Sequence, residues 1–405
     1  MHDFTSLHPA FGTDSPMWRS LREYGEPEPD CIDFGVAEMK FRLAPEIAEG
    51  IERQLREGSF GYSGAPESLK REIKDWMRRR HGWEIDTEWL NQTYGLVLGV
   101  GCCIRALTQP GDAVLLHFPS YPPFYRAIEQ NGRRLVRTDL VETERGWEMD
   151  FEDMERKIVS ENVKLLILCS PQNPTGRVWT REELRRVGEM CLAHGVMVVS
   201  DEIHFDICYT GHEHTVFASI SEDFAANSVV LTAPSKTFNI AGMTISNVLT
   251  PNPELRERVR AAIARDMGGY FNAFGYAACE AAYKNGEGWL EECLKVLEGN
   301  CRLFTDYLRE RIPVLRCHMP EGTYLMWMDC RRTGLDRAAL DSFLHKDAKF
   351  YSESGAVFGD GYELFHRVNL ACPRHYVEAG LERLEAAAKG RGLTYCNGNG
   401  TASGR

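Results

Sequence analysis

The sequence predicts an α/β protein built from two domains. A chain of 405 residues is longer than one ordinary hydrophobic core supports, which favours two domains. From about residue 90 onward, short runs rich in Val, Ile and Leu alternate with stretches of helical periodicity. Continuous apolar runs are typical of strands buried on both faces, so we expect a mostly parallel sheet flanked by helices.

The composition indicates a soluble globular protein, with 43% hydrophobic and 26% charged residues. The net charge of -12 argues against non-specific binding of nucleic acid. No apolar run reaches the roughly 20 residues that span a bilayer, and the first residues do not resemble a secretory signal. We therefore expect a cytoplasmic protein that binds neither nucleic acid nor membranes.

The thirteen cysteines are scattered, odd in number and without a C-x-x-C pair. This pattern predicts small core residues in a reducing compartment rather than a disulfide framework. The group His204, Cys208, His212 and His214 matches no common zinc pattern, so no metal site is expected.

The N-terminal part is irregular up to about residue 45 and then becomes helical. Periodicity predicts helices over 44–57 and 67–81, joined by a glycine-containing loop over 58–64. The basic run at 78–81 is expected to be a solvated helix end.

The central part alternates strands with helices such as 181–194, and a long helix is predicted over 288–312. The expected strands are 113–117, 163–169, 196–200 and 229–232. The expected organisation is an N-terminal segment 1–45 that packs with the small domain, a large domain 46–287, a C-terminal small domain 288–389 and a disordered tail 390–405.

A polar or aromatic side chain of a different type follows each predicted strand. Along the chain these are Tyr121, Asn173, Asp201 and Lys236. The carboxyl ends of parallel strands meet at one edge of a sheet, where ligands bind. Most lysines after strands are solvated loop residues, but a lysine that forms a Schiff base justifies the cost of burial.

These four side-chain types together fit pyridoxal 5'-phosphate. The lysine forms a Schiff base, the carboxylate holds the ring nitrogen protonated, the amide donates to the ring oxygen and the aromatic ring stacks on the cofactor. The phosphate needs backbone N–H groups at the start of a helix. The glycine-rich segment 94–101, followed by a predicted helix at 102–107, is the candidate for them.

Three motifs carry a resemblance to a known family: SPQNPTG (170–176), SDEIH (200–204) and SKTFN (235–239). They resemble fold-type-I pyridoxal-phosphate enzymes of the aminotransferase class I/II superfamily, and more narrowly the MalY/PatB group of cystathionine β-lyases. FGYS (60–63) and RVNLACP (367–373) support this resemblance, which spans about residues 30–387. It implies a large cofactor-binding domain with a central, mostly parallel seven-stranded sheet. The N-terminal segment and the C-terminal region would form a smaller α/β domain.

The resemblance assigns roles to the residues at the strand ends. Lys236 would be the Schiff-base lysine and would move protons, and Asp201 would pair with the ring nitrogen. Asn173, expected before a cis Asn173–Pro174 bond, would contact the ring oxygen and the substrate. Tyr121 would stack on the ring and contact the substrate. His204 would contact the cofactor and is typical of the C–S lyase branch.

Further roles concern the phosphate and the substrate. The backbone amides of Val97 and Leu98 and the hydroxyl of Ser235 would bind the phosphate. Tyr62 would reach the phosphate of a neighbouring subunit, which implies a homodimer with a composite active site. For the small amino-acid substrate, Arg367 would bind the carboxylate and Val36 would lie beside it.

The chain departs from the family pattern at three places. Thr244 stands where many aminotransferases have a phosphate-binding arginine, which favours the C–S lyase branch. Lys40 reverses a charge of the N-terminal substrate segment, so the sulfur substituent of the substrate is left open. Ala233 and Pro234 precede Ser235 where another serine is common, so phosphate binding would depend more on backbone groups.

Each assigned residue also has an ordinary structural interpretation. His204 could be a buried structural histidine, Tyr121 a core aromatic, Arg367 a member of a surface ion pair and Tyr62 a loop aromatic. The occurrence of all the motifs in the family order favours the functional interpretation.

The implied reaction is α,β-elimination from cystathionine or a related cysteine S-conjugate, with release of a thiol, pyruvate and ammonia. An amino-acid aminotransferase is the alternative, because it shares every step through removal of the Cα proton, and only Thr244 and His204 favour elimination. A third hypothesis is a regulatory protein-binding role beside the enzymatic one. About 40 residues precede the expected fold, too few for a DNA-binding domain.

Overall fold

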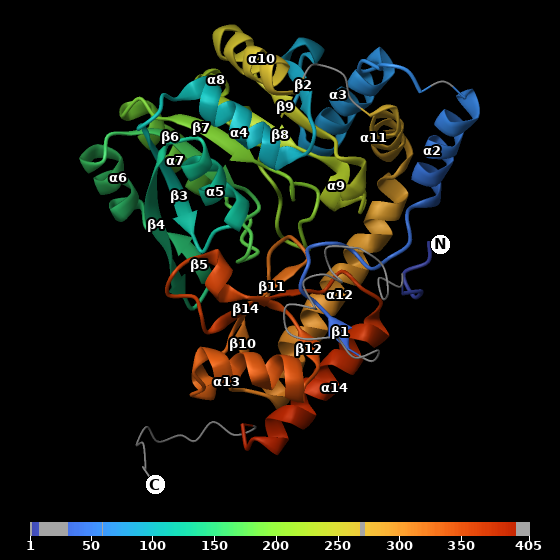
Figure 1. Cartoon of the computed structure of the whole chain (residues 1–405), viewed down its shortest axis with the longest axis vertical. Coiled ribbons are helices and arrows are strands. Elements are labelled where there is room, and N and C mark those ends of the chain that lie inside the picture. Colours follow the sequence, from blue (N-terminus) through green and yellow to red (C-terminus); the bar gives the residue numbers. More distant parts are fainter. Residues whose placement is uncertain (1, 8–30, 59, 268–271, 394–405) are drawn as a thin grey trace. The chain divides into compact units, whose positions relative to one another are not determined.

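The computed structural model describes residues 2–7, 31–58, 60–267 and 272–393, which form two compact units. Of the described residues, unit 1 takes His2, those within 42–294 and Glu321–Thr323; unit 2 takes those within 3–41, Lys295–Pro320 and those within 324–393. One later passage from unit 1 to unit 2, between Leu294 and Lys295, lies within one long helix, α12 (Glu287–Arg311) (Figure 1). The predicted disordered tail lies outside the described residues from 394 onward.

Unit 1 is built on a sheet with eight strands in its described residues, in the order β2-β9-β8-β7-β6-β3-β4-β5 (Figure 1). Neighbouring strands from β8 to β4 are parallel, whereas β9 and β5 pair antiparallel with their neighbours. The bounds are β2 Leu90–Thr93, β3 Ala113–Phe118, β4 Arg134–Thr143, β5 Gly146–Met149, β6 Val163–Cys169, β7 Met197–Asp201, β8 Ser228–Thr232 and β9 Ser246–Leu249.

The mostly parallel sheet is confirmed, and it has one strand more than the expected seven. The chain reverses after Thr143 and returns as the short antiparallel strand β5. β3 and β8 are buried at every position, as their continuous apolar runs predicted. β7 lies one residue later than expected, so Asp201 is its last residue and pairs with Cys169 of β6.

Helix α4 (Leu96–Leu107) packs against β2, β7, β8 and β9. The prediction of a glycine turn before a helix at residue 102 was wrong, because the helix already begins at Leu96. Gly99 serves close packing instead: a Cβ there would lie 2.8 Å from the side chain of Leu231 in β8. The turn itself is made at Gly95, whose φ is 85°.

The three other helices of unit 1 whose bounds were predicted from the sequence, α2, α3 and α7, agree with those bounds within one residue. α3 has its expected bounds and buries Leu69, Ile73, Trp76 and Met77, the apolar positions seen in the sequence. The bounds are α2 Pro45–Glu57, α3 Glu67–His81, α5 Pro122–Gln130, α6 Phe151–Ser160, α7 Arg181–Ala193, α8 Glu222–Ala226, α9 Pro234–Thr237, α10 Pro253–Met267 and α11 Ala273–Asn285.

Unit 2 contains an antiparallel sheet in the order β10-β11-β14-β13 and a separate parallel pair, β1 and β12. Its core includes Phe34, whose ring stacks on Phe350 with centroids 4.6 Å apart. Gly380 allows this packing, because a Cβ there would lie 2.7 Å from the Phe34 ring. The bounds are β1 Ile32–Asp33, β10 Arg316–Cys317, β11 Leu325–Asp329, α13 Arg337–Asp341, β12 Phe350–Tyr351, β13 Glu353–Ser354, β14 Phe365–Asn369 and α14 Arg374–Gly390.

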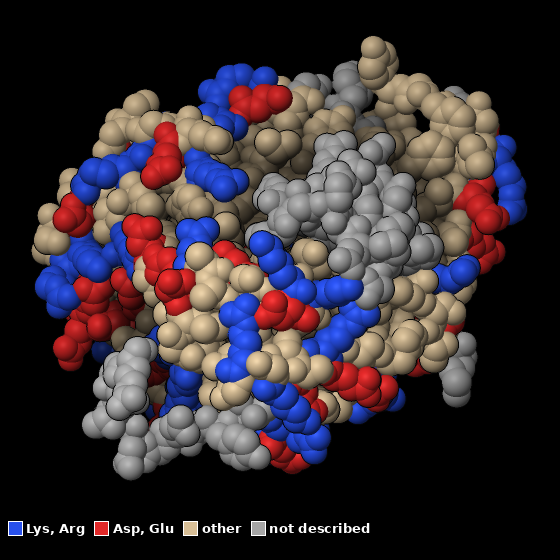
Figure 2. Space-filling view, turned by 60° about the horizontal axis from the view of Figure 1, so that its bottom comes forward, with Lys and Arg blue, Asp and Glu red and all other residues tan. Residues whose placement is uncertain are grey.

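Charged side chains of both signs are mixed on the face displayed in Figure 2. Opposite charges also lie next to each other in exposed ion pairs, such as Arg56–Glu52 and Arg185–Glu182. None of the helices in the described part of the chain is both long enough and apolar enough to span a bilayer.

The buried His366 predicts a loss of stability in acid. Burial lowers its pKa from 6.5 to about 3, and its Nδ1 lies 2.9 Å from the Ser352 hydroxyl. Between these two values the unfolded chain binds one proton more than the folded chain. The contribution of neutral His366 to the free energy of unfolding is therefore fully present above pH 6.5. Below that pH it falls by up to about 1.4 kcal/mol per pH unit.

Thermal melting at pH 7 and pH 5 checks this expectation. The difference in melting temperature should be smaller in His366→Gln than in the wild-type protein. His375, which is exposed on α14, provides the control, and His375→Gln should keep the wild-type difference. An unchanged difference in His366→Gln would contradict the assignment.

Candidate functional site

The carboxyl ends of β3, β6, β7 and β8 meet at one edge of the sheet in unit 1 because these strands are parallel neighbours. Backbone bonds align the edge: the Ser170 amide donates to the Asp201 carbonyl at 2.9 Å, and the Glu202 amide donates to the Leu231 carbonyl at 2.8 Å. The structure thus brings the segments that carry Tyr121, Asn173, Asp201 and Lys236 to the same edge, as the sequence predicted.

Asp201 is a buried carboxylate whose cost of burial is only partly offset by hydrogen bonds. It is 2% exposed, and burial raises its pKa to about 7, against the effects of the Ile203 amide and the Lys236 charge. Its Oδ1 accepts the Ile203 N–H at 2.9 Å. Within the described residues its Oδ2 has no hydrogen-bond donor. The arrangement suits a ligand that brings a cationic N–H to this oxygen.

Lys236 lies in the four-residue helix α9, which begins two residues after β8. The expectation that the lysine directly follows the strand was therefore inexact, because Pro234 starts a helical turn first. Lys236 and Ser235 are half-buried. The charge of Lys236 acts on Asp201 and lowers its pKa, which places the amine within electrostatic reach of the carboxylate.

The N-terminus of α4 offers backbone donors at the predicted phosphate position. The amide of Gly99 bonds to the Gly95 carbonyl at 3.4 Å, so the amides of Leu96, Val97 and Leu98 precede the first hydrogen bond of the helix. Val97 is half-buried and Leu98 is exposed. Free N–H groups and the helix dipole favour an anion here, and the phosphate role stays a prediction.

The remaining candidates at this edge have defined local structure. Asn173 is buried, and the Asn173–Pro174 bond is cis, as expected. Tyr121 precedes α5 and is half-buried, with its ring edge-to-face against Phe124 at 5.4 Å. His204 is buried three residues after Asp201. Thr244 is exposed and has a positive φ of 49°.

Two of the four predicted substrate-binding residues, Arg367 and Val36, lie in unit 2. Arg367 on β14 is buried, and its Nη2 lies 3.8 Å from Oε2 of the partly exposed Glu353. Its Nη2 donates to the Gly35 carbonyl at 3.1 Å, and its guanidinium lies 5.0 Å from the centre of the Phe358 ring. The Val36 carbonyl accepts from Asn369 Nδ2 at 2.6 Å. Within unit 2, β14 therefore fixes the segment that carries Val36.

The structure shows the surroundings of Lys40, whose role the sequence left open. It is 4% exposed, and its Nζ lies 3.0 Å from Oδ2 of Asp33 within unit 2. Asp33 also accepts the Gly35 amide at 2.9 Å through Oδ1. The reversed charge is therefore neutralised internally, and it gives no argument about the substrate.

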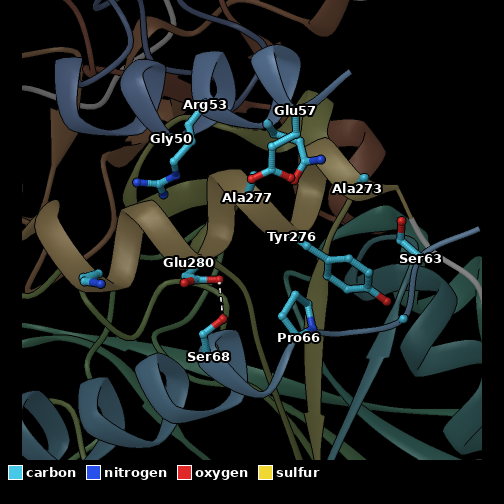
Figure 3. Close-up of a pocket in the computed structure, with 13 residues that line it drawn as sticks. Gly50, Arg53, Glu57, Ser63, Pro66, Ser68, Ala273, Tyr276, Ala277 and Glu280 are labelled. Carbon is cyan, nitrogen blue, oxygen red and sulfur yellow. Dashed lines mark hydrogen bonds between the residues drawn. The ribbon is translucent and has the colours of Figure 1, made fainter. Parts of the chain in front are cut away.

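Tyr62 is 92% exposed, and the neighbouring Phe60 stacks on Phe274 at 5.3 Å. Beside this loop lies a cavity of about 580 Å³, which Figure 3 shows between α2, α11 and the chain that leads into α3. Ser68 donates to Glu280 within it at 3.0 Å. The cavity is lined by none of the residues predicted from the sequence, so it is separate from the predicted site.

Asp206, a buried carboxylate, was not predicted from the sequence, and it contacts Thr237, the residue next to Lys236. Its Oδ2 accepts the hydroxyl of Thr237 at 2.7 Å, and its Oδ1 accepts Trp76 Nε1 at 3.0 Å and His81 Nε2 at 2.8 Å. The expectation that the basic run 78–81 is solvated was thus wrong at its end, because His81 is held inward. A fully buried tryptophan needs a hydrogen-bond acceptor for its N–H. Because Trp76 is one of the apolar positions of the predicted helix 67–81, the sequence already indicated that it needs such an acceptor.

Glu202 was also missed as a buried group. Its carboxylate accepts Ser200 Oγ at 2.8 Å and the Phe217 amide at 3.0 Å, and it lies 2.8 Å from His214 Nε2. It therefore anchors the turn after β7 and raises the pKa of Asp201. In the part of the chain that is described, no group of His, Cys, Asp and Glu residues is arranged to hold a metal ion.

Comparisons with known proteins agree with this geometry. The model of the family described as aminotransferase class I and II matches residues 29–384. The chain is 39% identical over 386 residues to cystathionine β-lyase PatB of Bacillus subtilis (strain 168), which covers 95% of this chain and 99% of that relative. It is 32% identical over 388 residues to protein MalY of Escherichia coli (strain K12), covering 95% and 98%.

Among solved structures, cystalysin from Treponema denticola, which contains a pyridoxal 5'-phosphate cofactor, matches with a TM-score of 0.94 at 38% identity. The match covers 96% of this chain and 100% of that chain.

The buried ion pair of Lys40 predicts a specific stability defect. Lys40→Met leaves the carboxylate of Asp33 buried and unpaired, which should cost about 3–5 kcal/mol of unfolding free energy. The double variant Lys40→Met/Asp33→Asn should recover most of this loss. Denaturant unfolding checks both, with Arg56→Met as the control because its pair with Glu52 is exposed. Wild-type stability in Lys40→Met would contradict the assignment.

Proposed function

This chain belongs to the aminotransferase class I and II family, and on that premise we propose that it is a pyridoxal-phosphate-dependent carbon–sulfur β-lyase. Its substrate is cystathionine or a related cysteine S-conjugate, and its products are a thiol, pyruvate and ammonia. Sequence similarity to PatB and MalY over nearly the whole of each relative supports elimination rather than amino transfer.

One structural observation carries the proposal: a buried carboxylate with an unoccupied acceptor oxygen lies at a strand end within electrostatic reach of a lysine. Asp201 Oδ2 has no donor in the described part of the chain, and the Lys236 charge lowers the pKa of Asp201. The residues therefore fit pyridoxal 5'-phosphate. Lys236 would hold it as a Schiff base, Asp201 would hold its ring nitrogen, and the amides of Val97 and Leu98 with Ser235 would hold its phosphate.

When bound, the cofactor supplies an electron sink for the charge that develops at the substrate Cα. The ionised Asp201 carboxylate keeps that sink effective, because a cationic N–H partner lowers the pKa that burial has raised. The amine of Lys236 would take the proton from Cα of the bound substrate. The Cβ–S bond then breaks with its electron pair on sulfur, and a proton converts the leaving group to a thiol. Hydrolysis of the three-carbon remainder gives pyruvate and ammonia.

Roles for the substrate follow from side chains that the fold holds rigidly. Arg367 would bind the substrate carboxylate, because the Gly35 carbonyl and the Phe358 ring hold its guanidinium in place. Asn173 and Tyr121 would contact the same substrate from the strand ends. The exposed Thr244 in place of an arginine supports the lyase assignment.

The proposed assembly is a homodimer with a composite active site. The proposed location of the protein is the cytoplasm. The extreme exposure of Tyr62 supports the homodimer, because such a ring can reach a neighbouring subunit. Leu55 and Phe60 nearby are large apolar side chains that are more than half exposed, and a second copy would cover them. All twelve described cysteines are free thiols, which suits a reducing compartment.

Product analysis tests the reaction. With cystathionine and no keto acid, the enzyme should release pyruvate and homocysteine in equal amounts over many turnovers. Lys236→Ala should lose at least about a thousandfold in kcat, because it removes both the cofactor attachment and the proton carrier. Turnover that stops after one equivalent and resumes only with added keto acid would identify an aminotransferase instead.

Mixing two inactive variants tests the composite site. In the proposed shared site, Lys236 comes from one subunit and Tyr62 from the other. A mixed dimer of the Lys236→Ala and Tyr62→Ala variants therefore contains one intact site. Refolding an equal mixture should restore about a quarter of the wild-type activity, since half of the dimers are mixed and each has one working site. No recovery, with dimers present by light scattering, would show that Tyr62 acts within its own subunit.

A further inference from the structure

The segment that carries Lys236 is joined to helix α3 through one buried carboxylate. Thr237, the residue directly after Lys236, donates its hydroxyl proton to Oδ2 of Asp206 at 2.7 Å. The other oxygen of Asp206 accepts the N–H groups of Trp76 and His81, both from α3. Asp206 and Thr237 are both buried, so water does not compete for these hydrogen bonds.

We propose that Asp206 is a positioning residue for Lys236, acting through Thr237. Helix α9 has four residues, and a helix this short makes few hydrogen bonds of its own, such as the one from the Phe238 amide to the Pro234 carbonyl at 2.9 Å. Its orientation must therefore come from side-chain contacts. The inference rests on the proposed function, since it requires Lys236 to bind the cofactor and move the proton.

The carboxylate is itself held firmly. Burial lowers the pKa of His81, so its neutral ring donates one N–H to Asp206 while stacking on Phe205 at 4.5 Å. Arg80 Nε lies 3.4 Å from the same oxygen, and Arg80 also lies 2.6 Å from Glu291 of α12. Charge-assisted bonds from α3 thus fix Asp206, and its bond with the hydroxyl of Thr237 fixes the turn that carries Lys236.

A purely structural role would need only the bonds to α3. Trp76 and His81 already give Asp206 two donors on Oδ1, and these offset part of the free-energy cost of burying its charge. The bond from Oδ2 to Thr237 is the feature that points to positioning. A change at Thr237 that leaves the α3 bonds intact therefore separates the two roles.

Thr237→Val removes the hydroxyl at nearly constant side-chain volume. In the holoenzyme, kcat for elimination should fall by about tenfold or more, whereas KM should stay within about twofold, because a misplaced amine slows proton transfer and leaves substrate binding unchanged. After removal of the cofactor, the variant should bind added pyridoxal 5'-phosphate covalently on Lys236 about tenfold more slowly. The absorbance of the bound cofactor measures this rate.

Two matched variants control the experiment. Thr237→Ser keeps the hydroxyl and should restore both rates to within about twofold of the wild type. Thr250→Val makes the same change at an equally buried threonine whose hydroxyl has no hydrogen-bond partner in the described residues, and it should alter neither rate. Wild-type kcat and capture rate in Thr237→Val would overturn the inference and leave the lyase function standing. A wild-type protein that neither captures the cofactor nor eliminates a thiol would instead refute the proposed function.

If Thr237→Val does not fold, the pair Thr237→Ala and Thr237→Ser replaces it, measured below both melting temperatures. These two variants differ by one hydroxyl group. Slower capture and lower kcat in Thr237→Ala than in Thr237→Ser support the inference, and equal values contradict it.

Discussion

Burial of three carboxylates at the end of β7 is the constraint on which the site depends. Unpaired buried charge costs several kcal/mol, so each carboxylate needs donors. Glu202 takes a hydroxyl, a backbone amide and a histidine, and Asp206 takes donors on both oxygens. Asp201 takes one backbone amide. The protein thus satisfies two of the carboxylates itself and leaves the third with capacity for a ligand.

The same three groups link local structure to chemistry. Glu202 and Asp206 hold the turn that follows β7, and Asp206 extends this order to the lysine turn through Thr237. The parallel pairing of β7 and β8 then sets Asp201 and Lys236 at one edge of the sheet. The cofactor chemistry needs this arrangement, because the ring nitrogen and the Schiff base are at different positions of one rigid molecule.

The sequence predicted what depends on local pattern. Continuous apolar runs predicted the parallel strands, periodicity predicted α3 to the residue, and motif order predicted the side chains at the strand ends. It could not predict what depends on distant partners. Whether Lys40 and His81 are solvated is decided by Asp33 and Asp206, and no local pattern shows those pairings. Gly99 of α4 was predicted to lie in a turn because its packing partner, Leu231, is distant in the sequence.

The crystal structure of the protein with its cofactor would test the central claim most directly. We predict continuous density between Nζ of Lys236 and the cofactor, with the ring nitrogen hydrogen-bonded to Oδ2 of Asp201 and the phosphate at the amides of Val97 and Leu98. A ring nitrogen that faces another group, with Asp201 still lacking a donor on Oδ2, would contradict the account.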